Sequence, residues 1–209
     1  MSGERAMTSY LDRREKPKLA RPSDADMRLK NNRLGMTIFQ ASWVMVFLAL
    51  IVVNWQLRFS YKAWPPAGVA PFDPLLPSAA TAALLLSSLL ARRGLASLRS
   101  GRSSAFLMHW RGAMVLGIAF MSIIVYEFAS VSEAAMATQY GLTMRLMTGF
   151  HFAHALAILA VMTHVYRKGG RGMYRGDEHD SWAVEGTAKL WYFVTLAWLL
   201  FYIVLYWIR

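Results

Sequence analysis

Five apolar stretches, each about the length of a membrane-spanning helix, limit what this chain can fold into. They cover residues 34–57, 75–91, 106–130, 142–166 and 184–208. A helix needs about 20 apolar residues to cross the hydrocarbon core of a bilayer. Hydrophobic residues make up 56% of the chain, and the charged 17% lie mostly between these stretches. The sequence therefore predicts an all-α, polytopic membrane protein, a bundle of five transmembrane helices.

Lysine and arginine alternate between the connections, and this alternation predicts the orientation of the chain. Residues 1–33 carry nine of them, 92–105 carry four and 167–183 carry four, whereas 58–74 carry two and 131–141 none. Positively charged connections are retained on the cytoplasmic side of a membrane. We therefore expect a cytoplasmic N-terminus and a C-terminus on the outer face.

The N-terminal region differs in composition from the remainder of the chain. Residues 1–33 are polar and basic and contain no apolar core, so we expect no signal peptide in them. We expect a cytoplasmic arm, which is either disordered or surface-lying, or docked on a partner subunit, followed by a membrane domain over residues 34–209. The net charge of +11 fits a cytoplasmic and anionic-lipid environment better than nucleic acid, because no nucleic-acid-binding motif is present.

The ionisable residues inside the spans are candidate functional residues, because burying them in lipid is costly. His151 and His154 lie one turn apart on the fourth span and share a face. Glu127, near the outer end of the third span, reaches that face if the two helices are antiparallel neighbours. Such a cluster would satisfy its own polar groups, hold a lipid headgroup or relay protons, and the pattern leaves all three open.

Other polar residues are assigned to packing and to the membrane interface. Glu185 precedes Lys189 by four residues, which is the favourable order for a helical ion pair. Arg111 and His164 lie at the same predicted membrane depth, and we expect them to reach the interface. Small side chains let helices approach closely in lipid, so the second span should pack against its neighbours through Ser78, Ala79, Ala82, Ala83, Ser87 and Ser88.

A haem-binding role for the histidines finds little support. His151 and His164 are 13 residues apart, or about 20 Å along a helix, which would suit two stacked haems. Each bis-histidine haem needs a second histidine from another helix. His109 is the one histidine in a different predicted span, and it could at most partner His164.

No zinc-protease, phosphate-loop or serine-hydrolase motif is present. The absence of cysteine excludes disulfides and thiolate metal sites.

Six segments in order along the chain resemble subunit III of the haem–copper oxidases, the cytochrome c oxidase subunit 3 family. They are LGMTIFQASWVMVF (34–47), WPPAGV (64–69), PLLPSAATAALLLSS (74–88), LGIAFMSIIVYEF (116–128), TGFHFAHALAIL (148–159) and VEGTAKLWYFVTLAWLLFYIVLYW (184–207). Longer family members have two further N-terminal helices, so the resemblance implies a five-helix form.

The resemblance implies a non-catalytic subunit of an oxidase in the bacterial inner membrane. Its partners would be subunit I, which holds the haems and copper, subunit II and membrane phospholipids. The whole complex would reduce O2 and translocate protons, whereas this chain would bind no cofactor except phospholipid and would support proton uptake and integrity. Glu127, His151, His154 and Glu185 would be the polar-core and lipid-facing positions, with Arg111, His164 and Lys189 at the interface.

Two departures from the family pattern leave alternatives open. The family usually has a carbodiimide-reactive glutamate where this chain has Trp43, which cannot ionise. In the last helix, Tyr192 and Thr195 stand where the family typically has histidine and aspartate. These changes suggest a divergent branch, such as an accessory protein of a nitric oxide reductase or of another respiratory supercomplex. A membrane haem-b electron carrier is the third hypothesis.

Overall fold

The computed structural model describes residues 23–174 and 176–208, and within them it contains helices and no strand. The predicted arm over residues 1–33 lies outside the described residues except for its last part. The helices are α2 (Asp24–Phe59), α3 (Leu75–Arg99), α4 (Ser103–Ser130), α5 (Glu133–Met136), α6 (Gln139–Gly170) and α7 (Trp182–Tyr202), which a π-helical turn, η1 (Ile203–Trp207), continues.

Five of these helices are long and apolar enough to cross a membrane, which confirms the predicted all-α class and the five spans. The helices extend beyond the apolar stretches, most clearly in α2, which begins ten residues before Leu34. Ser23 starts it with a capping box, in which its hydroxyl accepts from the amide of Asp26 and the Asp26 carboxylate accepts from the amide of Ser23. Hydropathy marks where a helix is apolar, whereas capping decides where it begins.

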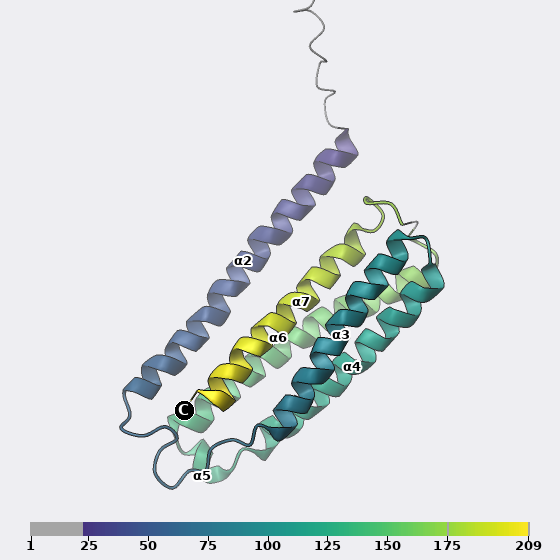
Figure 1. Cartoon of the computed structure of the whole chain (residues 1–209). Helices are drawn as coiled ribbons and strands as arrows, with labels where there is room; N and C mark the ends of the chain where they lie inside the picture. The colour runs from purple at the N-terminus through teal and green to yellow at the C-terminus, as the bar shows by residue number, and fades with distance from the viewer. Residues whose placement is uncertain (1–22, 175, 209) are drawn as a thin grey trace, which may run out of the picture.

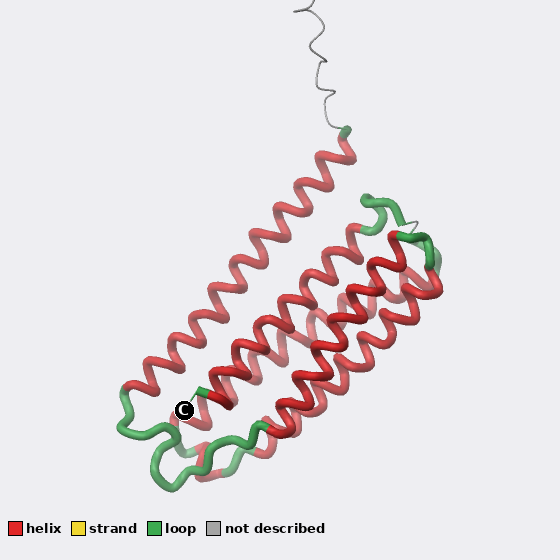
Figure 2. The backbone as a smooth tube through the Cα atoms, in the orientation of Figure 1, coloured by secondary structure: helices red, strands yellow, loops and turns green. Residues whose placement is uncertain are grey.

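Four helices form a ring, and the fifth lies against its outside (Figures 1 and 2). Around the ring, α3 packs on α4, α4 on α6, α6 on α7, and α7 on α3. Helix α2 packs on α7 and α6 and lies at the edge of the bundle in Figure 1. The short connections between successive helices make sequence neighbours antiparallel, as in other helical bundles.

Serine and tryptophan side chains join α3 to its neighbours inside the ring. The hydroxyl of Ser87 donates to the carbonyl of Ala113 on α4 at 2.6 Å and accepts from the indole of Trp191 on α7 at 2.9 Å. Gly117 on α4 leaves room for Trp191, since a Cβ there would lie 2.7 Å from the indole ring. The close approach of the three helices therefore depends on two small residues, Ser87 and Gly117, which leave room for the indole of Trp191.

Further polar contacts continue along the α3–α7 interface. Trp198 donates its indole N–H to Thr81 at 2.8 Å. The hydroxyl groups of Ser88 and Thr195 are 2.6 Å apart, and those of Ser78 and Tyr202 are 2.5 Å apart. The prediction that the small residues of this span face neighbouring helices is confirmed for Ser78, Ser87 and Ser88. It is wrong for Ala79 and Ala82, which are exposed.

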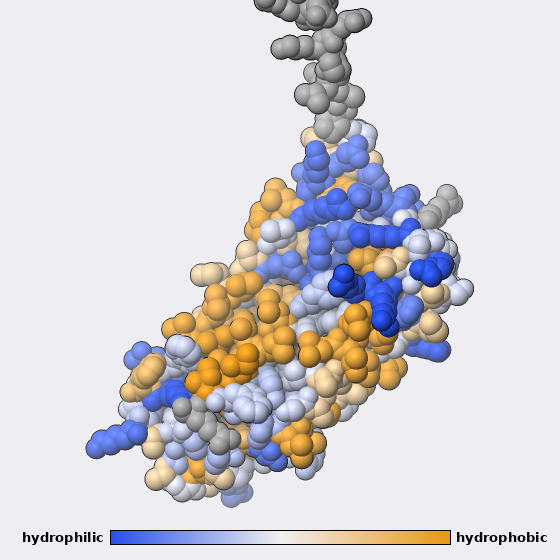
Figure 3. Space-filling view, in the orientation of Figure 1, coloured by the Kyte–Doolittle hydropathy of each residue, from blue (hydrophilic) through white to orange (hydrophobic). Residues whose placement is uncertain are grey.

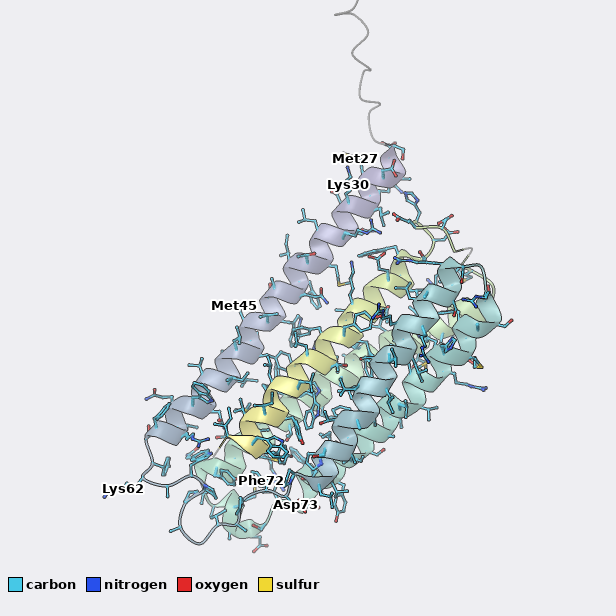
Figure 4. All side chains as sticks on the ribbon, in the orientation of Figure 1. Met27, Lys30, Met45, Lys62, Phe72 and Asp73 are labelled. Carbon is cyan, nitrogen blue, oxygen red and sulfur yellow. The ribbon has the colours of Figure 1, made fainter. Side chains whose placement is uncertain are left out.

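Helix α2 contacts the ring along one face. Phe47 is buried in the groove between α6 and α7, and the amide of Gln40 donates to the carbonyl of Lys189 at 3.0 Å. Near the other end, Arg58 donates to the carbonyl of Ile208 at 2.5 Å. The opposite face leaves apolar side chains exposed, among them Met45, which points away from the ring in Figure 4.

The connection between α2 and α3 folds over one end of the bundle. Phe72 stacks on Tyr140 with ring centroids 4.5 Å apart, and the Phe72 amide donates to the Tyr140 hydroxyl at 3.2 Å. Figure 4 places Phe72, Asp73 and Lys62 at this end, and Met27 and Lys30 at the other. The two ends of the molecule therefore carry different groups of connections.

We predict that the connection containing Lys62 faces outward and that the α6–α7 connection faces the cytoplasm, as the charge distribution requires. The chain has no cysteine, so single cysteines report location directly. Ala67→Cys in intact cells should react with a membrane-impermeant maleimide, whereas Met173→Cys should react only after permeabilisation. The reverse pattern would contradict the predicted orientation.

We predict that Gly117→Ala lowers the midpoint of thermal unfolding, because its Cβ would displace Trp191 and break the Trp191–Ser87 hydrogen bond. Overpacking of this kind costs about 1–3 kcal/mol. Gly35→Ala is the matched control, since a Cβ there meets nothing within 4 Å. Equal midpoints for the two variants would show that the close contact at Gly117 is unimportant.

Candidate functional site

The two histidines of α6 lie in the core of the bundle, halfway along the helix. His151 is 0% exposed and His154 is 5% exposed. His151 points into the ring of four helices, whereas His154 lies nearer to α2. The prediction that both share one face of the helix is confirmed, because each contacts the ring of Phe47.

Aromatic rings enclose His151. Its imidazole centroid lies 5.4 Å from that of Trp198, 5.8 Å from that of Phe120, 6.0 Å from that of Phe47 and 6.2 Å from that of Phe201. Neither ring nitrogen of His151 has a hydrogen-bond partner among the described residues. A buried polar group without a partner costs about 1–3 kcal/mol of stability. Because no polar contact offsets that cost here, the packing of the imidazole ring holds this histidine in place.

His154 lies between α2 and α7, where Trp43 covers it. The indole and imidazole centroids are 4.5 Å apart, and Phe193 contacts the imidazole from α7 at 5.6 Å. The Nε2 atom of His154 is buried without a partner in the described part of the chain. The imidazole of His154 is therefore covered by the apolar face of Trp43.

The expected contact between Glu127 and the histidines is wrong, although α4 and α6 are antiparallel neighbours. His151 faces Phe120, and Glu127 lies seven residues further along α4, an offset of about 10 Å. Glu127 is partly exposed near the end of the bundle, within electrostatic range of Asp73 and of Tyr206. The predicted antiparallel packing was right, whereas the predicted depth of the two groups was not.

The predicted pair of Glu185 with Lys189 is confirmed and belongs to a larger cluster. The Glu185 side chain is 8% exposed and accepts from Lys189 Nζ at 2.8 Å, from Arg99 at 2.8 Å and from Arg33 at 3.1 Å. Arg33 also lies 3.4 Å from the exposed carboxylate of Glu178. One buried carboxylate therefore holds cations from α2, α3 and α7 together.

Arg33 and Arg99 were not identified from the sequence as site residues. They are 66 residues apart in the chain, and each is more than 80 residues before Glu185. No local spacing therefore links the three residues. The one signal was that both lie at predicted cytoplasmic ends of helices, where Glu185 is also predicted to lie.

The remaining predicted residues lie apart from both groups. Arg111 and His164 are exposed on α4 and α6. His109 is partly buried, with its Nδ1 atom 3.5 Å from the hydroxyl of Ser97. The described residues hold no group of three or more histidine, aspartate or glutamate side chains arranged for a metal ion. Among the histidine and acidic side chains of the described residues, those buried in the bundle are thus the pair His151 and His154 and the ion-paired Glu185.

Comparison with known proteins gives a consistent result over the helical part of the chain. The family model for cytochrome c oxidase subunit III matches residues 24–209. The chain is 27% identical over 174 residues to cytochrome c oxidase subunit 3 of Synechocystis sp., which covers 82% of this chain and 73% of that protein. It is 30% identical over 188 residues to the Pisaster ochraceus protein of the same name, covering 84% and 69%, respectively.

We predict that Glu185→Gln lowers the midpoint of thermal unfolding, because three cations lose their shared carboxylate. Hydrogen bonds to charged groups contribute about 1.5–3 kcal/mol, and the partly exposed partners place the loss towards the lower end of that range. Glu178→Gln is the control, since it removes one exposed contact at 3.4 Å. An equal effect of the two substitutions would show that the cluster does not hold the three helices together.

Proposed function

Because the chain belongs to the cytochrome c oxidase subunit III family, we propose that it is the non-catalytic subunit III of a bacterial haem–copper terminal oxidase. In this proposal it lies in the cytoplasmic membrane beside subunits I and II, and subunit I carries out O2 reduction coupled to proton translocation. The observation that carries the proposal is the family match over residues 24–209, which includes all five long helices.

The internal geometry supports a structural role for the chain. Several polar side chains of the core form hydrogen bonds between its own helices, as Ser87 does between α3, α4 and α7. Glu185 is saturated by three cations, so it has little capacity left for proton exchange. Polar contacts that hold a subunit's own helices together suit it to bracing a partner subunit.

The family's finer roles, phospholipid binding and support of proton uptake, are part of the proposal. Of the four positions carried over by resemblance, His151, His154 and Glu185 are enclosed, and we assign them to the polar core. Glu127 is partly exposed at the end of α4. We therefore propose Glu127 as the member of the set that meets lipid or water.

An accessory role in a nitric oxide reductase or another respiratory supercomplex remains the second candidate, because Trp43 departs from the family pattern. Trp43 packs against His154, with the two ring planes tilted by 45°, where the family usually has a glutamate, so this position offers no ionisable partner to the imidazole. A haem-b carrier is disfavoured, because the rings around His151 fill the space that a haem on this residue would need.

Co-purification tests the proposed function. An affinity-tagged chain, expressed in its native host and extracted in mild detergent, should bring down a large subunit containing both haem and copper. A partner with haem and non-haem iron but no copper would favour the nitric oxide reductase candidate. Recovery of the chain alone, with a b-type Soret band of its own, would overturn both.

Substitutions at His151 separate packing from chemistry in the assembled complex. His151→Ala should lower the thermal stability of the complex while leaving the haem spectrum of the assembled enzyme unchanged, because a cavity replaces a ring in the aromatic cage. His151→Leu, of similar volume and without unpaired nitrogens, should retain the wild-type stability or exceed it. Loss of the haem spectrum from correctly assembled complex would contradict this assignment.

A further inference from the structure

A groove with a basic lining lies between α3 and α7, at the end of the bundle where α2 begins. It has a volume of about 550 Å³ and is lined by Arg92, Leu95, Ala96, Arg99, Ser100 and Tyr192. Four of these residues come from the C-terminal end of α3, Ser100 directly follows that helix, and Tyr192 comes from α7. None of the sequence patterns discussed above assigned this groove a role.

The groove carries more positive charge than its surroundings neutralise. Tyr192 lies within electrostatic range of both Arg92 and Arg99, so the two guanidinium groups and the phenol border one space. Arg99 is fixed by Glu185, which it shares with two other cations. Arg92 has no carboxylate partner among the described residues, and the lining contains no acidic side chain. The groove is therefore suited to an anion with several oxygen atoms.

An apolar track continues from the groove towards the other end of the bundle. Leu89 and Leu85 follow Arg92 along α3, and Leu196 and Leu200 follow Tyr192 along α7, all four with exposed side chains. Because α3 and α7 are antiparallel, both pairs run in the same direction, for about 10–12 Å. On the face drawn in Figure 3, a hydrophilic surface at this end likewise adjoins a broad hydrophobic one.

We propose that the α3–α7 groove binds one acidic phospholipid, with its phosphate between Arg92 and Arg99 and an acyl chain along the track of exposed leucines. Guanidinium groups bind phosphate oxygens in a bidentate geometry, and Tyr192 can donate a further hydrogen bond. A zwitterionic lipid fits less well, because the lining offers no carboxylate to its ammonium group. The apolar track favours a lipid over a free phosphate ion.

This site is separate from the residues to which the family resemblance assigned lipid contact. Glu127, His151 and His154 lie elsewhere in the bundle, and Glu185 acts here only by fixing Arg99. The inference needs the membrane-spanning arrangement, but it does not depend on whether the partner enzyme reduces O2 or nitric oxide. Its failure and that of the proposed function are therefore distinguishable.

Native mass spectrometry of the purified complex that contains this chain tests the proposal. The complex in detergent is titrated with phosphatidylglycerol or with phosphatidylcholine, and the fraction of lipid-bound chain is measured. We expect phosphatidylglycerol to bind at least five-fold more tightly than phosphatidylcholine, and Arg92→Gln to weaken phosphatidylglycerol binding at least five-fold. Arg93→Gln is the matched control, because it removes the same charge at the neighbouring exposed position, outside the groove.

Three results would overturn the proposal. The first is equal binding of the two lipids, and the second is an equal effect of Arg92→Gln and Arg93→Gln. The third is displacement of phosphatidylglycerol by an equimolar amount of inorganic phosphate, which would make the site one for a free anion. Arg92 is exposed and has no ion-pair partner among the described residues, so Arg92→Gln should keep the wild-type unfolding midpoint. An unchanged midpoint shows that the variant is folded and that its weaker lipid binding comes from the missing guanidinium group.

Discussion

The contacts between α3 and α7 hold the bundle together, because lipid supplies no hydrophobic force between helices. Association in a membrane depends instead on close packing and interhelical hydrogen bonds. Ser87 provides both, since its small side chain admits the indole of Trp191 while its hydroxyl bonds two neighbouring helices. Thr81, Ser88 and Arg99 extend the same interface towards its two ends. Around this pair, α4 packs on α3, whereas α6 and α2 pack on α7.

The histidine pair and the glutamate cluster represent two ways of accommodating polar side chains in such a bundle. Glu185 is surrounded by cations from three helices, which offsets the cost of its burial. His151 has no such partner in the described part of the chain and lies among aromatic rings. The first arrangement locks helices together, whereas the second relies on shape. Both arrangements fix side chains within the bundle, which agrees with the bracing role proposed above.

Particular residues illustrate how far sequence reasoning reached. The apolar stretches predicted all five long helices, and the four-residue spacing predicted the pair of Glu185 and Lys189. The contact between Glu127 and the histidines was wrong, because relative depth depends on where each helix begins, which capping and connections decide. Arg33 and Arg99 were missed because their partner lies on another helix, and a single sequence carries no signal for contacts between distant segments.

The amino-acid sequence alone determined that this chain forms five membrane-length helices, that its charges lie between them, and which family it resembles. These properties depend on composition and on short-range spacing, which are local. Only the tertiary structure decided that Trp43 covers His154, that three cations share Glu185, and that Arg92, Arg99 and Tyr192 border one groove. These contacts join residues tens of positions apart, and they arise from the register and rotation of packed helices.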